Sequence, residues 1–139
     1  MFKPNWLPFY GDISYRGPCN REIVDQIDFI SWLQKELPEY YRLTFHPKVE
    51  GRRNFAQATI DKKTGSMKSG VSDVICIGSP MLVMEIKRKD EKKSTWRDGQ
   101  LKFLEESQKA GAYVCLAFGF EGAKEAFAHW VTLQAKNDS

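Results

Sequence analysis

The chain has 139 residues, 42% of them hydrophobic and 28% charged, which fits one compact domain and argues against a disordered protein. No apolar run is long enough to cross a bilayer, and the first residues lack the continuous apolar stretch of a signal peptide, so we expect a cytoplasmic protein. Three unclustered cysteines and two histidines argue against disulfides and zinc chemistry, and we expect Cys76 and Cys115 to be buried free thiols.

Hydrophobic periodicity predicts alternating helices and strands after an irregular beginning. Residues 1–19 are aromatic, proline-bearing and aperiodic, which predicts an ordered arm or lid. The expected helices span 20–38, 96–109 and 122–133, and the expected strands span 42–46, 71–77, 81–86 and 112–118. The strand at 112–118 enters by a crossover as a central strand, so the order predicts an α/β sandwich with a mixed sheet in a single domain at 20–139.

Caps and stripes give the expected helices their ends and their buried faces. The first helix should begin at a cap, Asn20. Its buried stripe should comprise Ile23, Ile27, Ile30, Leu33 and Leu37. Ser94 or Thr95 should cap the second helix, with Asp98 as the return partner of a capping box. The second helix should align Leu101, Leu104 and Gln108 on one side, and the last helix should bury Ala123, Phe127, Trp130 and Leu133.

The stretch from 70 to 87 carries acidic side chains inside apolar runs. The two runs are joined by a Gly-Ser-Pro turn, which predicts a β-hairpin. Side chains alternate along a strand, so Glu85 and Lys87 share one face. Antiparallel pairing can bring Asp73, near the start of the hairpin, opposite Glu85. Two carboxylates and one ammonium are therefore expected to converge at one edge of the sheet.

This constellation is suited to phosphate chemistry. Two carboxylates beside a main-chain carbonyl form an oxygen-rich site of the kind that Mg²⁺ or Mn²⁺ prefers, and a nearby lysine can orient a metal-bound water. The alternative is an internal salt bridge. Residues 48–69 and 87–97 each hold six Lys or Arg against two acids and flank the hairpin, which favours a polyphosphate partner. Lys-rich loops that are only solvated are the alternative reading of these segments.

The ordered motifs resemble the PD-(D/E)XK nuclease superfamily. Gly70-x-x-Asp73, eleven intervening residues and Glu85-Ile86-Lys87 are similar to its catalytic pattern. The first helix, then Phe45-His46-Pro47, then Glu50-Gly51-Arg52-Arg53 narrow the resemblance to the VRR-NUC branch in its stand-alone, phage or bacterial form. The resemblance covers roughly residues 20 to 128, and a longer, more polar insert at 55–69 departs from it.

The resemblance implies a restriction-endonuclease-like α/β sandwich and a Mg²⁺- or Mn²⁺-dependent endonuclease that hydrolyses DNA phosphodiesters. Its implied metal ligands are Asp73, Glu85, the main-chain carbonyl of Ile86 and, for a second ion or a metal-bound water, Glu22. Glu22 shares a helix face with Gln26, although an acid on a first turn more often complements the helix dipole. Lys87 would orient the attacking water, and Gln100 would reach back toward Lys87 or a phosphate. The implied DNA contacts are Arg52, Arg53, Lys68, Arg88 and Lys89.

The resemblance also implies partners. Stand-alone proteins of this kind look like homodimers that cut branched DNA such as four-way junctions, in the cytoplasm of a bacterial or phage-infected cell, with no membrane and no nucleotide cofactor. The aromatic arm, with Phe2, Trp6, Phe9, Tyr10 and Tyr15, is either the dimer surface or a cover over its own core.

The main alternative function is a non-catalytic nucleic-acid-binding module on the same fold, and a second is a small-molecule or structural protein. The intact set of Asp73, Glu85 and Lys87 argues against both, because a buried carboxylate without a metal or a partner is costly.

Overall fold

The computed structural model describes residues 1–47 and 70–137, and contains a five-stranded sheet in the order β1-β5-β4-β3-β2. The strands are β1 (Phe9–Tyr10), β2 (Thr44–Phe45), β3 (Val74–Cys76), β4 (Leu82–Lys87) and β5 (Tyr113–Phe118), and the helices are α1 (Glu22–Glu36), α2 (Pro38–Tyr41), α4 (Gln100–Lys109) and α5 (Gly119–Asn137), with a 3₁₀ turn, η1, at Glu91–Lys93. The predictions for Arg52, Arg53, Lys68 and the insert at 55–69 lie outside the described residues.

Strand pairing produces the mixed sheet that the sequence predicted. β3 and β4 form the antiparallel hairpin, with Ile75 opposite Val83. β4 pairs in parallel with β5, because α4 carries the chain across between them. β1 adds to the free side of β5, also in parallel, and β2 pairs with β3 at the opposite edge. The predicted α/β architecture with a central mixed sheet is therefore confirmed.

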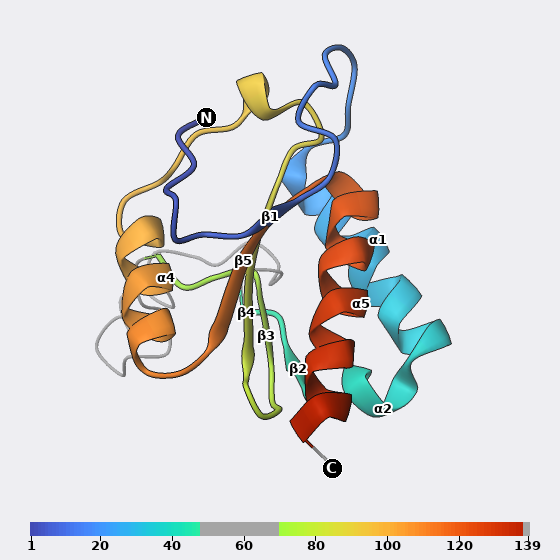
Figure 1. Ribbon diagram of the computed structural model, residues 1–139. Helices are drawn as coiled ribbons and strands as arrows, with labels where there is room; N and C mark the ends of the chain where they lie inside the picture. The colour runs from blue at the N-terminus through green and yellow to red at the C-terminus, as the bar shows by residue number, and fades with distance from the viewer. Residues whose placement is uncertain (48–69, 138–139) are drawn as a thin grey trace, which may run out of the picture.

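Helices cover both faces of this sheet (Figure 1). α1 and α5 lie together on one face, and α4 lies on the other, where the N-terminal arm of residues 1–19 crosses the end of the sheet. Two apolar clusters follow from these layers. The larger one, under α1 and α5, includes Phe29, Leu33, Met84, Phe127 and Trp130. The smaller one, under α4 and the arm, includes Leu7, Val83, Leu104 and Leu116.

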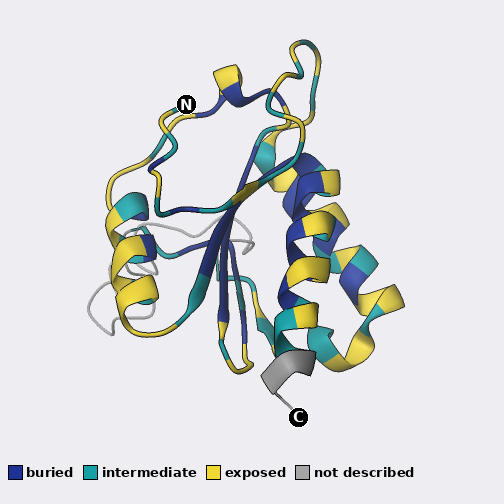
Figure 2. Ribbon diagram, viewed as in Figure 1, coloured by how far each residue is buried: buried dark blue, intermediate teal, exposed yellow. Residues whose placement is uncertain are grey.

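β4 is buried at all six of its positions, and the strands at the centre of the sheet are correspondingly dark in Figure 2. Met84 and Ile86 face the larger cluster, and Val83 faces the smaller one. Alternation leaves Glu85 and Lys87 on the same face as Val83, where they are 1% and 0% exposed. A charged pair therefore ends a fully buried strand, as predicted.

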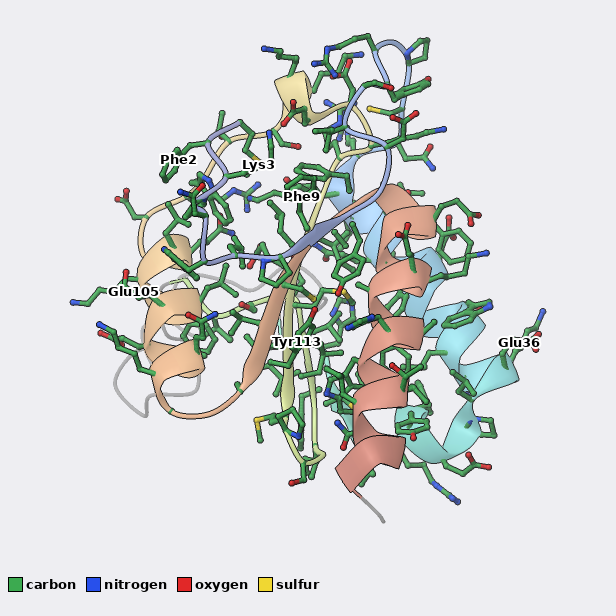
Figure 3. All side chains as sticks on the ribbon, in the orientation of Figure 1. Phe2, Lys3, Phe9, Glu36, Glu105 and Tyr113 are labelled. Atoms are coloured by element: carbon green, nitrogen blue, oxygen red, sulfur yellow. The ribbon has the colours of Figure 1, made fainter. Side chains whose placement is uncertain are left out.

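The arm folds back over its own core. Leu7 is buried in the smaller cluster, and Trp6 packs against it. The indole Nε1 of Trp96 donates a hydrogen bond of 2.8 Å to the main-chain oxygen of Phe2. Figure 3 labels Phe2, Lys3 and Phe9 along the arm, and the Phe2 and Phe9 side chains stay 67% and 41% exposed. Of the two roles expected for the aromatic arm, the structure shows the cover over the core.

The buried face of α1 is not the predicted one. Ile23 and Ile27 are 41% and 50% exposed, and Leu33 is the member of the expected stripe that is fully buried. The residues that α1 buries are Asp25, Gln26, Phe29 and Leu33. The helix is turned so that its two large buried residues meet the sheet and α5 while its first turn faces a polar cavity, so tertiary packing overrides the local apolar pattern. The expected cap is also wrong, because α1 begins after Arg21, which makes no side-chain cap.

α4 begins later than predicted, and its capping box is wrong. The helix starts at Gln100 behind Gly99, which has a φ of +84° and makes no side-chain cap. Residues 94–99 stay irregular, because the Thr95 carbonyl accepts a hydrogen bond from Lys87 and the Arg97 N–H donates to Gln100. On α4 itself, Leu104 is buried, Leu101 is half-buried and Gln108 is exposed.

β2, β5 and α5 follow the predictions with shifted ends, whereas β1, α2 and η1 were not predicted. β5 is an interior strand between β1 and β4, and β2 is shorter than the expected 42–46. α5 extends beyond 122–133 at both ends. It fully buries Ala123, Phe127 and Trp130, as predicted, while Leu133 is half-buried. Cys76 and Cys115 are buried free thiols, and Cys19 is half-buried. In the described part of the chain, no helix is long and apolar enough to span a membrane.

Candidate active site

A polar cavity of about 400 Å³ lies beside the end of β4. It is lined by Arg21, Glu22, Ile23, Gln26, Asp73, Arg88, Lys93, Thr95, Arg97 and Gln100. These side chains come from the start of α1, the residue before β3, the loop after β4 and the start of α4. Glu22, Asp73, Arg88 and Gln100 were expected as site residues, so the fold brings four of the predicted positions to one cavity.

Two acids face one another across the hairpin. The β3–β4 register pairs Val74 with Met84, and one residue further along, the same register places Asp73 opposite Glu85. Both residues are buried, with 2% and 1% of their surface exposed. The Ile86 N–H donates a hydrogen bond of 2.8 Å to Asp73 Oδ2, and Gln100 Nε2 donates one of 2.9 Å to Glu85 Oε1. These hydrogen bonds hold the two carboxylates in fixed orientations. Groups that are fixed in this way do not have to reorganise during a reaction.

The Lys87 ammonium is completely buried beside these acids. Its Nζ donates hydrogen bonds of 2.9 Å to the Thr95 carbonyl and to Gln100 Oε1, and it lies 3.7 Å from Glu22 Oε1. The ring centre of Trp96 lies 5.6 Å away. Burying a cation is costly unless it is paired and hydrogen-bonded, and these contacts meet that requirement. Gln100 therefore joins Lys87 to Glu85 through the two ends of one amide.

The glycine of the Gly70-x-x-Asp73 motif has a steric role. Gly70 has a φ of +83°, and a Cβ on it would lie 2.3 Å from the carbonyl carbon of Gly99. The two backbones can approach so closely because neither residue carries a side chain, and a left-handed φ favours glycine in any case. This contact fixes the segment that leads to Asp73 against the residue that precedes Gln100.

Glu22 lies among cations. Its Oε2 is 3.9 Å from Arg97 Nη2, and its other oxygen faces Lys87. Gln26, one turn further along α1, is 5% exposed and lines the same cavity. Both side chains therefore point at the site, as their shared helix face predicted. In this structure Glu22 neutralises the lysine.

The donor atoms present fit a hard divalent cation. Asp73, Glu85 and the main-chain carbonyl of Ile86 offer oxygen atoms, which Mg²⁺ and Mn²⁺ prefer. Within residues 1–47 and 70–137, no cluster of three or more His, Cys, Asp or Glu side chains is arranged to hold a metal ion. The main-chain carbonyl would therefore be needed beside the two carboxylates.

Of the residues predicted to contact DNA, the structure places one at the cavity and one away from it. Arg88 lines the cavity, but its guanidinium donates hydrogen bonds of 3.0 Å to the main-chain oxygens of Asn20 and Cys19, so it also fastens the start of α1. Lys89 does not line this cavity and lies over the Tyr15 ring, 4.2 Å from its centre. The other three predicted contacts are in 48–69. Sequence reasoning did not single out Lys93 or Arg97, whose only signal was a place in the basic segment 87–97, or Arg21, which lies in neither basic segment.

His46 is a further residue that sequence reasoning missed. Its Nδ1 lies 2.7 Å from the main-chain oxygen of Asp73. A carbonyl oxygen can only accept, so Nδ1 carries the proton. Burial lowers the pKa of His46, which favours the neutral ring. His46 thus holds the backbone of the first acid in place, and no spacing in the sequence indicates that contact.

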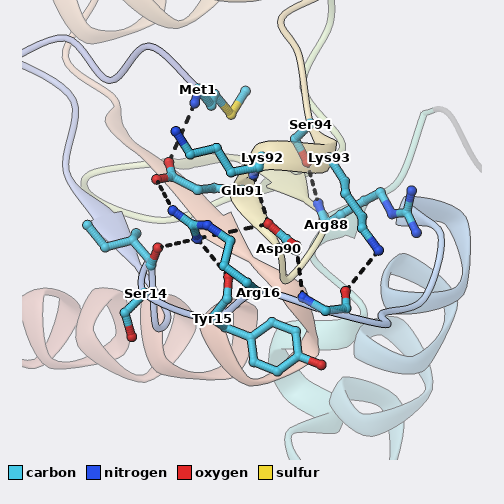
Figure 4. A network of polar contacts seen from close by, with 12 residues as sticks. Met1, Ser14, Tyr15, Arg16, Arg88, Asp90, Glu91, Lys92, Lys93 and Ser94 are labelled. Atoms are coloured by element: carbon cyan, nitrogen blue, oxygen red, sulfur yellow. Dashed lines mark hydrogen bonds and ion pairs between the residues drawn. The ribbon is translucent and has the colours of Figure 1, made fainter.

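The loop between β4 and α4 is fastened to the arm (Figure 4). Asp90 accepts hydrogen bonds of 3.0 Å from the N–H groups of Gly17 and Lys92. Glu91 accepts one from Lys3 and lies 3.7 Å from Arg16 Nη2. The arm therefore fixes the loop that carries the Thr95 carbonyl toward Lys87.

Comparisons with known proteins agree with this fold. No family model matches the sequence, and no curated protein matches it. A solved structure described as "VRR_NUC domain protein" superposes with a TM-score of 0.65, covering 84% of this chain and 92% of that chain at 20% sequence identity. The likeness shows that the chain has the fold of a VRR_NUC domain protein, as its motifs led us to expect.

Proposed function

We propose that this chain is a Mg²⁺- or Mn²⁺-dependent endonuclease of the PD-(D/E)XK type that hydrolyses DNA phosphodiesters. The observation that carries the proposal is the placement of Asp73 opposite Glu85, next to the buried Lys87, at a cavity lined by four cationic side chains. Buried charges contribute little net stability compared with apolar residues of the same volume, so a purely structural role would leave this cluster without a purpose. The fold shared with a VRR_NUC domain protein supports the same assignment.

The metal would be held by Asp73, Glu85 and the main-chain carbonyl of Ile86, with Glu22 serving a second ion or a metal-bound water. Such an ion supplies a Lewis acid for the phosphoryl oxygen and lowers the pKa of a bound water. Lys87 would orient the attacking water and offset the negative charge that develops on the phosphate. Gln100 positions Lys87 and Glu85 relative to each other.

The cavity rim would hold the DNA backbone. Arg21, Arg88, Lys93 and Arg97 line it, and the predicted Arg52, Arg53 and Lys68 belong to the same proposal. Cations that contact phosphates give no sequence specificity, so the rim itself would select DNA by its shape. The chain would act as a cytoplasmic homodimer that cuts four-way junctions or similar branches in preference to linear duplex.

The decisive experiment is a cleavage assay on labelled duplex, single-stranded, flap and four-way DNAs with Mg²⁺, Mn²⁺ or EDTA. Asp73→Asn and Glu85→Gln should abolish metal-dependent cleavage and leave binding intact, while Glu105→Gln, which removes an exposed acid on α4, should cleave normally. Lys87→Met should bind nearly normally and cut at least about a hundredfold more slowly in a single turnover. Tight DNA binding without cleavage under every condition would replace the proposal with the non-catalytic binding module.

The dimer is tested separately. Light scattering at micromolar concentration should give the mass of two chains, and junctions should be cut by paired nicks. A monomer that cuts linear and branched DNA equally well would refute the dimer and the shape preference, and would leave the assignment of Asp73 and Glu85 unaffected.

A further inference from the structure

A second cavity, of about 550 Å³, lies behind the wall of the candidate active site. Three pairs of consecutive residues separate the two cavities. Arg21, Gln26 and Arg88 line the first, and their neighbours Asn20, Asp25 and Lys89 line the second. The two cavities are therefore adjacent, with one layer of the chain between them.

The second cavity lies where α/β sheets commonly bind ligands. Gly11, Lys89 and Gly119 line it, and they follow the ends of β1, β4 and β5, which run parallel to one another. Crevices outside the carboxyl ends of parallel strands are frequent ligand sites. The first turn of α5 also lines the cavity, and the start of a helix offers N–H groups and a positive dipole to an anion.

One side chain of this cavity is left unsatisfied by the fold. Asp25 is 4% exposed, and its Oδ2 has no hydrogen-bond partner among the described residues. Its Oδ1 is 3.5 Å from Asn20 Nδ2, a long contact for a carboxylate. A buried carboxyl group with so few partners costs folding free energy. A ligand that brings N–H donors would satisfy Asp25.

Aromatic rings, one cation and two further acids, Asp12 and Glu121, line the cavity beside Asp25. Tyr15, Phe118 and Phe120 line the cavity, and Lys89 Nζ lies 4.2 Å from the ring centre of Tyr15. Aromatic side chains of this kind stack with nucleobases. Lys89 and the start of α5 would attract a phosphate. Within this lining, Asp12, Asp25 and Glu121 can accept hydrogen bonds from a base edge, the rings can cover its faces, and Lys89 is the cation that a phosphate can contact.

We propose that the second cavity receives one nucleotide of the DNA strand whose neighbouring phosphate lies in the candidate active site, with its base against Asp25 and its phosphate toward Lys89 and α5. The choice of a DNA strand rests on the proposed function. An ionised carboxylate can only accept hydrogen bonds. Guanine, which presents two adjacent N–H donors, is therefore the preferred base, and thymine, whose single N–H stands between two carbonyls, is the poorest.

Cys19 provides a readout that needs no cleavage. It lines the second cavity and is half-buried, whereas the other two thiols are buried. The experiment measures iodoacetamide alkylation of Cys19 in the full chain, in EDTA, by peptide mass spectrometry. Deoxyguanosine monophosphate should slow the alkylation, thymidine monophosphate should need about tenfold more for the same effect, and a short guanine-containing oligonucleotide should protect at far lower concentration than either.

Matched variants test the assigned contacts. Asp25→Asn should raise the protecting concentration of deoxyguanosine monophosphate about tenfold, whereas Asp28→Asn, an exposed change on the same helix, should not change it. Lys89→Ala should weaken protection, and Lys92→Ala, in the same loop but in neither cavity, should not. The Lys89 pair keeps the test valid if the Asp25 variant fails to fold.

Alkylation of Cys19 that responds to neither nucleotide nor oligonucleotide would overturn the inference, and so would protection by the free nucleotide without protection by the strand. The readout also separates the two proposals. Cleavage without protection of Cys19 would refute the nucleotide cavity alone. Protection that depends on Asp25, in a chain that never cleaves, would refute the endonuclease and keep the nucleotide cavity.

Discussion

Gln100 uses both ends of its side-chain amide inside the candidate active site. Its Oε1 accepts hydrogen bonds from Lys87 Nζ and from the Arg97 N–H, at 2.9 and 2.8 Å, and its Nε2 donates to Glu85 at 2.9 Å. The side chain is 2% exposed, so water cannot readily replace these partners. One residue therefore sets the relative positions of the lysine and of an acid.

Gln100→Leu keeps the size of the side chain and removes all three hydrogen bonds. We expect a loss of about 1–3 kcal/mol in the free energy of unfolding, because buried polar groups lose their partners, and a fall of at least about a hundredfold in single-turnover cleavage. Urea unfolding and cleavage of a preferred substrate measure the two effects. Gln34→Leu, at an exposed position of α1, is the control, and equal effects of the two substitutions would contradict the role given to Gln100.

Asp25 makes a prediction about pH. Burial raises the pKa of Asp25 above 3.8, and Asp28 adds to the rise, while Asn20, Arg88 and Lys89 oppose it. The folded chain thus keeps this proton over a window in which the unfolded chain has lost it, so Asp25 costs stability as pH rises through that window. Asp25→Asn should raise Tm at about pH 7 and have less effect at about pH 3.5. A gain in Tm that is the same at both values would show that ionisation of Asp25 is not the cause.

Motif spacing in the sequence identified the residues that share one strand or one hairpin. Asp73, Glu85 and Lys87 could be placed together because strand alternation and antiparallel pairing are local rules. His46 and Asp25 could not be found in this way. The contact of His46 with Asp73 and the burial of Asp25 both depend on how separate elements pack, and such packing leaves no periodic signal.

At the scale of elements, α1 shows where the apolar pattern misleads. Ile23 and Ile27 are spaced like a buried stripe, yet they are exposed. The helix serves two environments, an apolar one at Phe29 and Leu33 and the polar cavity at Glu22 and its neighbours. The rotation of α1 about its axis is the one that places its apolar residues against the core and its polar residues at the cavity. The existence of α1, α4, α5 and of β2 to β5 was predictable, whereas α2, the rotation of α1 and the delayed start of α4 were not.

This rotation can be tested by truncating side chains. Leu33→Ala removes a fully buried side chain and should cost about 2–5 kcal/mol of unfolding free energy. Ile27→Ala removes one that is 50% exposed and should change it by only about 0.5 kcal/mol. Urea unfolding of the two variants compares them directly. A larger loss for Ile27→Ala would restore the stripe that the sequence predicted.

At the scale of the whole molecule, the arm, the sheet and the active-site loop form one unit. β1 extends the sheet beside β5, and the Leu116 N–H donates a hydrogen bond of 2.9 Å to the Pro8 carbonyl. Lys3 and Arg16 reach from the arm to Glu91 in the loop that follows β4. The sequence of the arm is aperiodic, so its strand could not be predicted. Its pairing arises because the folded sheet offers a free edge to a nearby segment.

Glu91→Gln should loosen this unit without unfolding it. The hydrogen bond from Lys3 lowers the pKa of Glu91 below its usual 4.5, so the ion pairs contribute above that value and are lost as pH falls through the lowered pKa. At neutral pH the variant loses them, and the Leu116 and Gly17 amides should exchange with solvent about fivefold faster, the effect of an ion pair worth about 1 kcal/mol. Hydrogen exchange measured by NMR reports both amides, with Met84 in central β4 as the unchanged reference. Glu106→Gln, which breaks an exposed pair with Lys102, should leave all three amides unchanged.

Since the same loop presents Thr95 to Lys87, Glu91→Gln should also slow single-turnover cleavage while DNA binding stays normal. Unchanged amide exchange in Glu91→Gln would mean that the arm holds its place by strand pairing and apolar contact alone.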